Sequence, residues 1–427
     1  MIDTIETALT LFIMLMLIAQ LVALRLRIPY TLILVFIGIV VTAFSTIALN
    51  LGHSAGFLLT AVMLIQSLYN QLVVSGLFVG MVVPPLIFEA MMHIKREELR
   101  RVIRPSLALA TFGVLLSTIV AGIVVWKLAG ISLLAALLFA TIISPTDTVT
   151  VLQVFKHIKV PSRLSTLMDL EAAFNDATAI VLFSIVLTLS SAGLSHETVF
   201  NALEIFLYSF VGGVFVGILV GRIALTVHAK INDKLTELTL TIAAVYGSYV
   251  LANALGASGL IAVAFVGLYF GNNTLKRAIS RHVRASIISF WEIAAFVGTA
   301  IAFLFIGFTV NLNIFFQAIS LILVAYLSTI IARAVTVYPT FAIFSSRGLK
   351  LPLKWGNIAT LGGVRGAISI ALVATLANSG ALYGSELSTI TAMVLGVVFI
   401  SIIIQTPILS TYAGRLFGRY KTTHEMQ

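Results

Sequence analysis

The chain contains no cysteine, and only 10% of its 427 residues are charged. The absence of cysteine excludes disulfides and thiolate chemistry, although it says nothing about the cellular compartment. The shortage of charge excludes an ordinary soluble protein, in which about 25% of the residues are charged. The sequence consists largely of long apolar runs, and 60% of the residues are hydrophobic. The composition therefore predicts an all-α, polytopic membrane protein.

Motifs for nucleotide-driven and metal-dependent chemistry are absent as well. The sequence holds no Walker, zinc-protease or dinucleotide fingerprint, and none of its seven histidines forms a spaced metal-ligand pair. The formal net charge of +10 does not indicate nucleic acid, because the basic residues lie in short loops between apolar runs. We therefore expect no enzymatic activity, no cofactor, no nucleic-acid partner and no ATP-driven transport by this chain alone.

Thirteen apolar runs are candidates for membrane-spanning helices, which need about 20 residues each. The first run follows Asp3 and Glu6 instead of basic residues, so we expect a retained helix and not a signal peptide. The run at residues 55–68 is short, and we place it in the membrane interface. The thirteen spans cover residues 8–24, 30–50, 71–93, 106–127, 131–154, 164–191, 199–227, 235–255, 258–271, 285–310, 313–343, 355–378 and 387–413.

The basic residues show a strong asymmetry when alternate loops are followed along these spans. All but four of the 26 Lys and Arg residues fall on one side, and the exceptions are Lys127, Arg222, Arg333 and Arg365. Basic loops face the cytoplasm in multi-pass proteins. The pattern supports thirteen spans, with the N-terminus outside and the C-terminus in the cytoplasm.

Two spans contain helix breakers near their middle. The fifth reads "LFATIISPTDTVTVLQVF", with Pro145 near Asp147, and the twelfth reads "IATLGGVRGAISIALVATL", with three glycines around Arg365. A simple kink is the alternative for either span alone. The two lie seven spans apart, and each is second in a set of three, so the sets have opposite orientations. This layout indicates an inverted repeat with two broken, crossing helices.

Acidic and amide side chains interrupt the apolar runs at a few positions. Asp147 and the hydroxyl of Thr146 lie at the first break, where hard oxygen donors suit Na⁺ or Li⁺, although Asp147 alone is also typical of a helix cap. Asn175 and Asp176 follow Glu171 by four and five residues. Helical geometry then directs Asp176 toward an aqueous cavity and Glu171 toward another helix.

Two further charged residues within the apolar runs must be accommodated in the membrane. Arg333 requires a buried anion, and we assign Glu171 as its partner in a structural salt bridge. Glu89 lies near the cytoplasmic end of the third span. It either snorkels to the surface or lines the cavity as part of a proton path.

These residues fall in a set of motifs that occur together in one family. The motifs, in order, read "PPLIFEA", "SPTDTVTV", "EAAFNDATAIVLF", "FWEIAAFVGTAIAFLFIG", "ARAVTVYP" and "GGVRGAISIAL". The sequence resembles the monovalent cation/proton antiporter-1 family, which includes the NhaP-type antiporters of prokaryotes and the Na⁺/H⁺ exchangers of animals. The resemblance extends from about residue 10 to residue 413.

The resemblance implies one membrane domain over residues 1–427 that forms a homodimer in the lipid of the cell membrane. Residues 1–104 and 235–310 would form the dimerisation part, and residues 105–195 and 313–413 the ion-binding core. Residues 199–227 would be a linker helix, and residues 414–427 a short cytoplasmic tail. Transport would proceed by elevator-like movement of the core.

The resemblance also assigns roles to individual residues. Na⁺ would bind at Asp176, Asp147 and Thr146, beside Asn175. Other residues would have supporting roles, which are the salt bridge of Glu171 with Arg333, the crossover position of Arg365 and the cavity position of Glu89. One departure concerns the residue after Glu171. Many members have Ser there, whereas this chain has Ala172, which leaves the choice between Na⁺ and K⁺ open.

The expected function is secondary antiport of Na⁺ or Li⁺ against H⁺, which serves pH homeostasis. A carboxylate at Asp176 holds a proton or a cation but not both well, so competition couples the two fluxes. Because Asn175 is an amide and carries no second proton, we expect electroneutral exchange of one H⁺ for one Na⁺.

Three alternatives are weighed against it. The first is a K⁺-selective or broad monovalent cation/H⁺ antiporter on the same fold. The second is an intramembrane aspartyl protease with Asp147 and Asp176 as its dyad, although the Gly-x-Gly-Asp motif of those enzymes is absent. The third is a passive channel, whose currents would not depend on a pH gradient.

Overall fold

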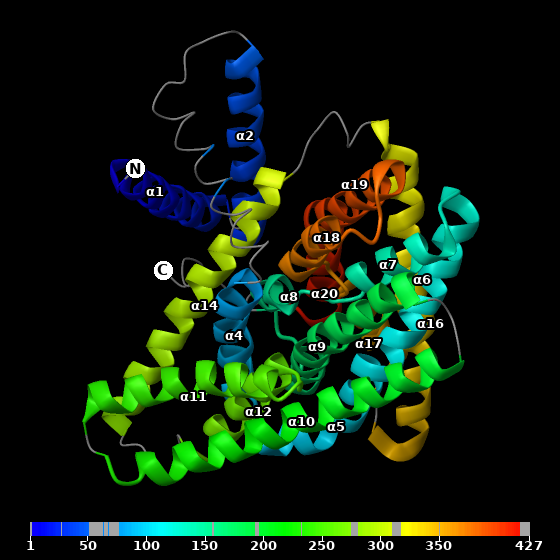
Figure 1. Ribbon diagram of the computed structural model, residues 1–427. Helices are drawn as coiled ribbons and strands as arrows, with labels where there is room; N and C mark the ends of the chain where they lie inside the picture. The colour runs from blue at the N-terminus through cyan, green and yellow to red at the C-terminus, as the bar shows by residue number, and fades with distance from the viewer. Residues whose placement is uncertain are drawn as a thin grey trace.

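The computed structural model is helical throughout the part of the chain that it describes, with no β-strand in that part (Figure 1). The described residues exclude 1, 27, 51–62, 64–66, 68–76, 156–157, 193–195, 232, 275–280, 310–316, 350 and 419–427. The all-α prediction is therefore confirmed, whereas the expected interfacial run at 55–68 lies almost wholly outside the described residues.

The helices follow the apolar runs of the sequence closely. The first half of the chain contains α1 (Ile2–Leu26), α2 (Tyr30–Asn50), α4 (Leu77–Met92), α5 (Arg96–Ala108), α6 (Val114–Ala129), α7 (Leu133–Ile143), α8 (Thr148–Phe155), α9 (Ser162–Ala192) and α10 (His196–His228). The second half contains α11 (Lys234–Ala254), α12 (Gly259–Tyr269), α14 (Arg281–Thr309), α16 (Ile319–Phe344), α17 (Leu353–Leu361), α18 (Ala367–Ser379), α19 (Gly384–Ile400) and α20 (Thr406–Phe417). In the described part, π-helical turns adjoin these helices at Leu109–Gly113, Phe270–Thr274 and Ser401–Gln405, and Ser345–Leu349 contains a kink with non-helical backbone at Arg347 and Gly348.

Seven helical stretches in the described part are long and apolar enough to cross a membrane, and several shorter helices are apolar as well. Two of the seven join neighbouring helices, so that α5 and α6 form one stretch and α19 and α20 another. The number of thirteen spans and the inverted repeat stay predictions.

Capping residues set several helix ends where the sequence changes from polar to apolar. The Ser132 hydroxyl accepts a hydrogen bond from the Ala135 amide at 3.2 Å and begins α7. The Asp233 carboxylate accepts one from the Thr236 amide at 2.8 Å and begins α11. The hydrogen bonds from Thr236, led by that from its hydroxyl, lower the pKa of Asp233, so this exposed cap is charged at neutral pH.

Small residues allow the helices of the bundle to approach closely. A Cβ added at Gly38 of α2 would lie 2.6 Å from the Leu304 carbonyl oxygen and 2.8 Å from Cα of Gly307 in α14. Only a glycine pair permits this backbone contact. The contact brings α2 and α14 together beside the helices that carry the polar residues.

Two helical segments are interrupted inside the bundle. One break separates α7 from α8 at residues 144–147, and the other separates α17 from α18 at residues 362–366. Helix α9 packs against α7, α8 and α18, so the two breaks and α9 meet at one place (Figure 1).

Candidate ion-binding site

The two helix breaks touch each other directly. The Asp147 amide of the first break donates a hydrogen bond to the Val364 carbonyl of the second, at 2.7 Å. A Cβ added at Gly366 would lie 2.7 Å from Cβ of Asp147, so only glycine fits at this position. The breakers that the sequence shows are therefore sites of contact between two opened helices and not independent kinks.

Asp147 caps the second half of its own broken helix. Its Oδ2 accepts a hydrogen bond from the Thr150 hydroxyl at 2.5 Å and from the Thr150 amide at 3.3 Å. The Thr150 hydroxyl lies 3.4 Å from that of Thr31 in α2. Asp147 also lines the cavity described below. It is therefore both a helix cap and a residue of the cavity wall.

Arg365 supports the first break from the opposite side. Its Nη1 donates to the carbonyl oxygens of Ser144 at 2.7 Å and Pro145 at 3.2 Å, where α7 ends. The end of a helix carries partial negative charge, so a buried guanidinium is stabilised there. The Arg365 amide donates to the Ser401 hydroxyl at 3.1 Å. These contacts place Arg365 at the crossover of the two broken helices.

Asn175 links α9 to the first break. Its Nδ2 donates to the Thr146 hydroxyl at 2.7 Å and approaches Glu171 Oε1 at 3.5 Å. The side chain is fully buried, and its Oδ1 has no hydrogen-bond partner among the described residues. Asn175 therefore fixes the orientation of Thr146 and leaves one amide oxygen available in the polar centre.

Glu171 and Arg333 form a buried ion pair between α9 and α16. Nη1 of Arg333 contacts Oε1 of Glu171, and Nη2 donates to Oε2 at 2.7 Å. Nε and Nη2 of Arg333 also donate to the Ala359 carbonyl of α17, each at 3.2 Å. The pair thus joins three helices, and the bidentate geometry compensates both buried charges.

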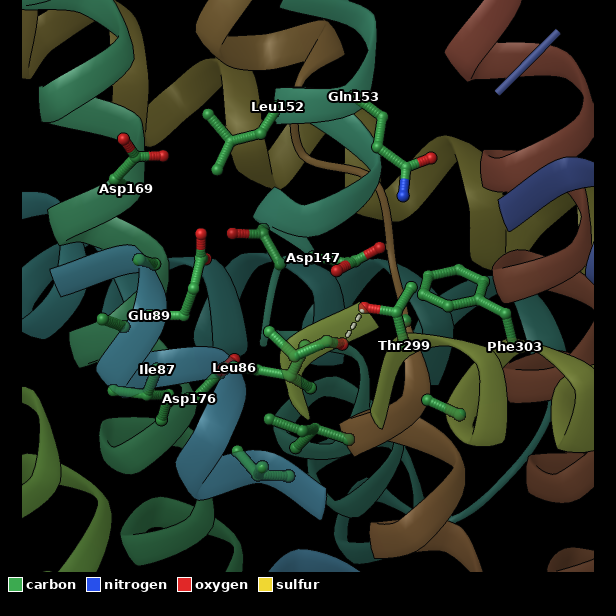
Figure 2. Close-up of a pocket in the computed structure, with 18 of the residues that line it drawn as sticks. Leu86, Ile87, Glu89, Asp147, Leu152, Gln153, Asp169, Asp176, Thr299 and Phe303 are labelled. Atoms are coloured by element: carbon green, nitrogen blue, oxygen red, sulfur yellow. Dashed lines mark hydrogen bonds between the residues drawn. The ribbon is translucent and has the colours of Figure 1, made fainter. Parts of the chain in front are cut away.

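A cavity of about 770 Å³ adjoins this network (Figure 2). Four of the residues singled out in the sequence line it, which are Thr146, Asp147, Asp176 and Glu89. The other four lie behind its wall, namely Asn175, Glu171, Arg333 and Arg365. Asp176 is thus on the cavity side of α9 while Glu171 faces α16 and α17. The arrangement brings three carboxyl groups and a hydroxyl to the wall of one cavity.

Asp169 is a cavity residue that the sequence reasoning missed. It lies on α9, lines the same cavity and interacts electrostatically with Glu89 of α4. Its spacing of seven residues from Asp176 is two helical turns and places both on one face. This spacing was the available signal. To identify Asp169 as a cavity residue from this spacing, one also has to know which face of α9 meets the cavity.

The comparison with known families decides the identity of the fold. The sequence model of the transmembrane sodium/hydrogen exchanger family matches residues 11–414. The chain belongs to this family. Exchangers are transporters and not enzymes, and the match together with the apolar helices shows a multi-pass membrane protein.

Two relatives and one solved structure are similar to this chain. The Na⁺/H⁺ antiporter NhaS2 of Synechocystis is 31% identical over 368 residues, which cover 84% of this chain and 62% of NhaS2. The Na⁺/H⁺ antiporter NhaP of Pseudomonas aeruginosa is 30% identical over 393 residues, which cover 90% of this chain and 91% of NhaP. The sodium proton antiporter MjNhaP1 of Methanocaldococcus jannaschii, determined at pH 8, superposes with a TM-score of 0.75 at 22% identity over 97% of this chain and 100% of that one. The last likeness supports the fold, and the chain spans less than two thirds of NhaS2.

The ion pair gives a prediction about stability. Glu171→Gln should lower the stability of the protein strongly, because Arg333 is left buried without its anion, and such a loss typically costs about 3–5 kcal/mol. Thermal unfolding of the detergent-purified protein measures the effect. Arg333→Met combined with Glu171→Gln should recover part of the loss, as a positive coupling in a double-mutant cycle.

Arg365→Met is the matched control for that cycle. Arg365 is equally buried but donates to backbone carbonyls, so its coupling to Glu171 should be much smaller than that of Arg333. A larger coupling of Glu171 to Arg365 would show that the ion pair is wrongly assigned.

Proposed function

We propose that this exchanger is a secondary antiporter that exchanges Na⁺ or Li⁺ for H⁺. The observation that carries the proposal is the meeting of Asp147 and Asp176 in one cavity at the contact of two broken helices. Opened helices at such a crossing present backbone carbonyls and half-helix ends to an ion. The names of NhaS2 and NhaP, both Na⁺/H⁺ antiporters, agree with this chemistry.

Proton and cation compete for the same carboxylate. Asp176 lines the cavity, lies within electrostatic reach of Asp147 and can take up either a proton or a cation. Asp147 and the Thr146 hydroxyl supply further oxygen ligands to the cation, which is the transported substrate. An empty core with uncompensated negative charge crosses the membrane poorly, whereas a loaded core crosses readily. This difference couples the two fluxes.

The stoichiometry follows from Asn175. Its amide donates to Thr146 and cannot carry a proton, so Asp176 is the single exchangeable acid at the centre. Each cycle then moves one H⁺ against one Na⁺ and transfers no net charge.

The moving unit would comprise residues 105–195 and 313–413. Within it, the Glu171–Arg333 pair braces α9 against α16, and Arg365 holds the break of α7. The remaining helices, residues 1–104 and 235–310, would hold the second copy of a homodimer, with α10 as the linker. Elevator-like movement of the core past this frame gives access to the two sides in turn.

The basic loops set the orientation of the proposed transporter. They place the N-terminus outside and residues 414–427 in the cytoplasm of a cell, with the protein in the plasma membrane. In this orientation inward protons drive Na⁺ out of the cell and contribute to pH homeostasis.

A K⁺-selective or broad monovalent cation antiporter is the second candidate. Ala172 lies between Glu171 and the cavity-wall residue Ala173, is buried and offers no hydroxyl to a cation. Fewer side-chain oxygens make a site less selective for the smaller, more strongly hydrated Na⁺. Comparison of Na⁺, Li⁺ and K⁺ gradients in liposomes separates the two candidates.

The first test concerns Asp176. Asp176→Asn should abolish Na⁺-driven proton movement in liposomes while the protein stays folded, because an amide cannot exchange a proton. Asp233→Asn is the matched control: this exposed cap is far from the cavity residues in sequence, and Asn caps helices as well as Asp does. Continued Na⁺-driven proton movement by Asp176→Asn would refute the assignment.

The second test concerns charge. Because one H⁺ exchanges for one Na⁺, the distribution of ions at equilibrium should not depend on a membrane potential imposed with K⁺ and valinomycin. The measurement is Na⁺ uptake into sealed liposomes that have no Na⁺ or pH gradient, with the K⁺ gradient alone setting the potential. Uptake driven by the potential alone would contradict one-for-one exchange and indicate a second proton carrier.

A further inference from the structure

Asp169 lies on the cavity wall in a row of residues along one face of α9. Ser165, Asp169, Ala173 and Asp176 all line the cavity, and their spacings of four, four and three residues are those of a helix face. Asp169 and Asp176 are two turns apart, which is about 10 Å along the helix axis. Asp169 and Asp176 therefore lie on the wall of one and the same cavity (Figure 2).

Asp169 lacks the partners that explain the other buried charges. Its Oδ1 is enclosed and accepts no hydrogen bond from any described residue. No Lys or Arg is among the described residues that line the cavity. Asp169 is also the eighth residue of α9, beyond the first turn in which an acid serves as a cap. An enclosed carboxyl oxygen without a partner is costly to the fold, so structure alone does not account for it.

The titratable groups around Asp169 form a series that leads to solvent. Glu89 of α4 is its electrostatic neighbour, with a side chain 28% exposed. His93, one turn further on, lies 3.6 Å from Glu89 and is 46% exposed. His93 also lies 4.0 Å from Glu292 of α14, which is 54% exposed. Exposure thus increases from Glu89 to His93 and Glu292, which makes this the more exposed end of the cavity.

We propose that Asp169 is a proton-relay residue between Asp176 and the more exposed end of the cavity. This role rests on the proposed antiport function. When a cation displaces the proton of Asp176, the proton passes through cavity water to the Asp169 carboxylate. It passes on to Glu89 or to solvent, and Asp169 returns to its carboxylate form. The reverse sequence protonates Asp176 when the cation leaves.

The relay leaves the stoichiometry unchanged. Asp169 takes a proton and releases it within the same half of the cycle, so it carries no second proton across the membrane. It acts on the rate of proton transfer and not on the binding of the cation. That difference separates a relay from an acid that merely attracts Na⁺ or supports the helix.

The test compares two reactions of the same protein in liposomes. One is Na⁺/H⁺ exchange, followed with a pH-sensitive dye, and the other is exchange of isotopically labelled Na⁺ for Na⁺, which needs no proton transfer. Asp169→Asn should lower the maximal rate of Na⁺/H⁺ exchange by ~10-fold or more, as the loss of a proton-transfer group commonly does. Na⁺/Na⁺ exchange and the KM for Na⁺ should stay at wild-type values.

Matched variants make the result specific. Asp169→Glu keeps a carboxyl group at the same place and should restore most of the Na⁺/H⁺ rate. Asp233→Asn makes the same chemical change outside the cavity and should alter neither reaction. Equal loss of both reactions in Asp169→Asn, a raised KM for Na⁺ with an unchanged maximal rate, or no loss at all would each overturn the relay.

A failure of the relay is distinguishable from a failure of the proposed function. If Asp176→Asn retains Na⁺/H⁺ exchange, the central carboxylate is wrongly assigned, whatever Asp169→Asn shows. If Asp176→Asn abolishes Na⁺/H⁺ exchange while Asp169→Asn leaves it intact, antiport at Asp176 stands and the relay is wrong.

Discussion

The hydrogen bond from the Asp147 amide to the Val364 carbonyl joins two helices at the points where each is broken. Opened backbone inside a bundle is tolerated only where other groups satisfy it. Here each break satisfies part of the other, and Arg365 donates hydrogen bonds to the Ser144 and Pro145 carbonyls at the negative end of α7. The position of Asp147 beside Gly366, and with it the shape of the cavity, depends on this contact.

The charges of the interior fall into two groups with different surroundings. Glu171 and Arg333 pair with each other, and Arg333 also donates to the Ala359 carbonyl, so the two charges are compensated inside the bundle. Asp176, Asp169 and Glu89 line the cavity instead, and no Lys or Arg of the described part lines it with them. The first group stabilises the helices at a fixed distance. The second group keeps negative charge available for a mobile cation or proton, which is the property that an exchanger needs.

The sequence allowed much of this arrangement to be predicted, because apolar length and helix breakers act locally. The all-α class, the positions of the helices and the two breaks follow from runs of residues, and the family match confirms the resemblance. Contacts between segments that are distant in the sequence were harder to predict. Glu171 and Arg333 are 162 residues apart, and pairing them required the argument that a buried cation needs an anion together with the resemblance.

Other features had no local signal of this kind. The contact of Asp147 with Val364 is made by a backbone amide and a backbone carbonyl. The identities of the two side chains therefore do not indicate it. Asp169 was missed because nothing in its immediate neighbours distinguishes a cavity face from a packed face of α9. The assignment of residues to a moving core and a fixed frame stays a prediction, since it concerns a motion and not one arrangement of helices.

The central claim is that a proton and a cation compete for Asp176. Its most direct test is the number of protons released when Na⁺ binds to the detergent-purified protein in weakly buffered solution, measured together with the amount of Na⁺ bound. Competition at one carboxylate predicts the release of up to one proton for each Na⁺, approaching one as the pH is lowered to where the empty site is protonated, and no release from Asp176→Asn. Binding of Na⁺ to the wild-type protein without proton release at any pH in this range would contradict the account.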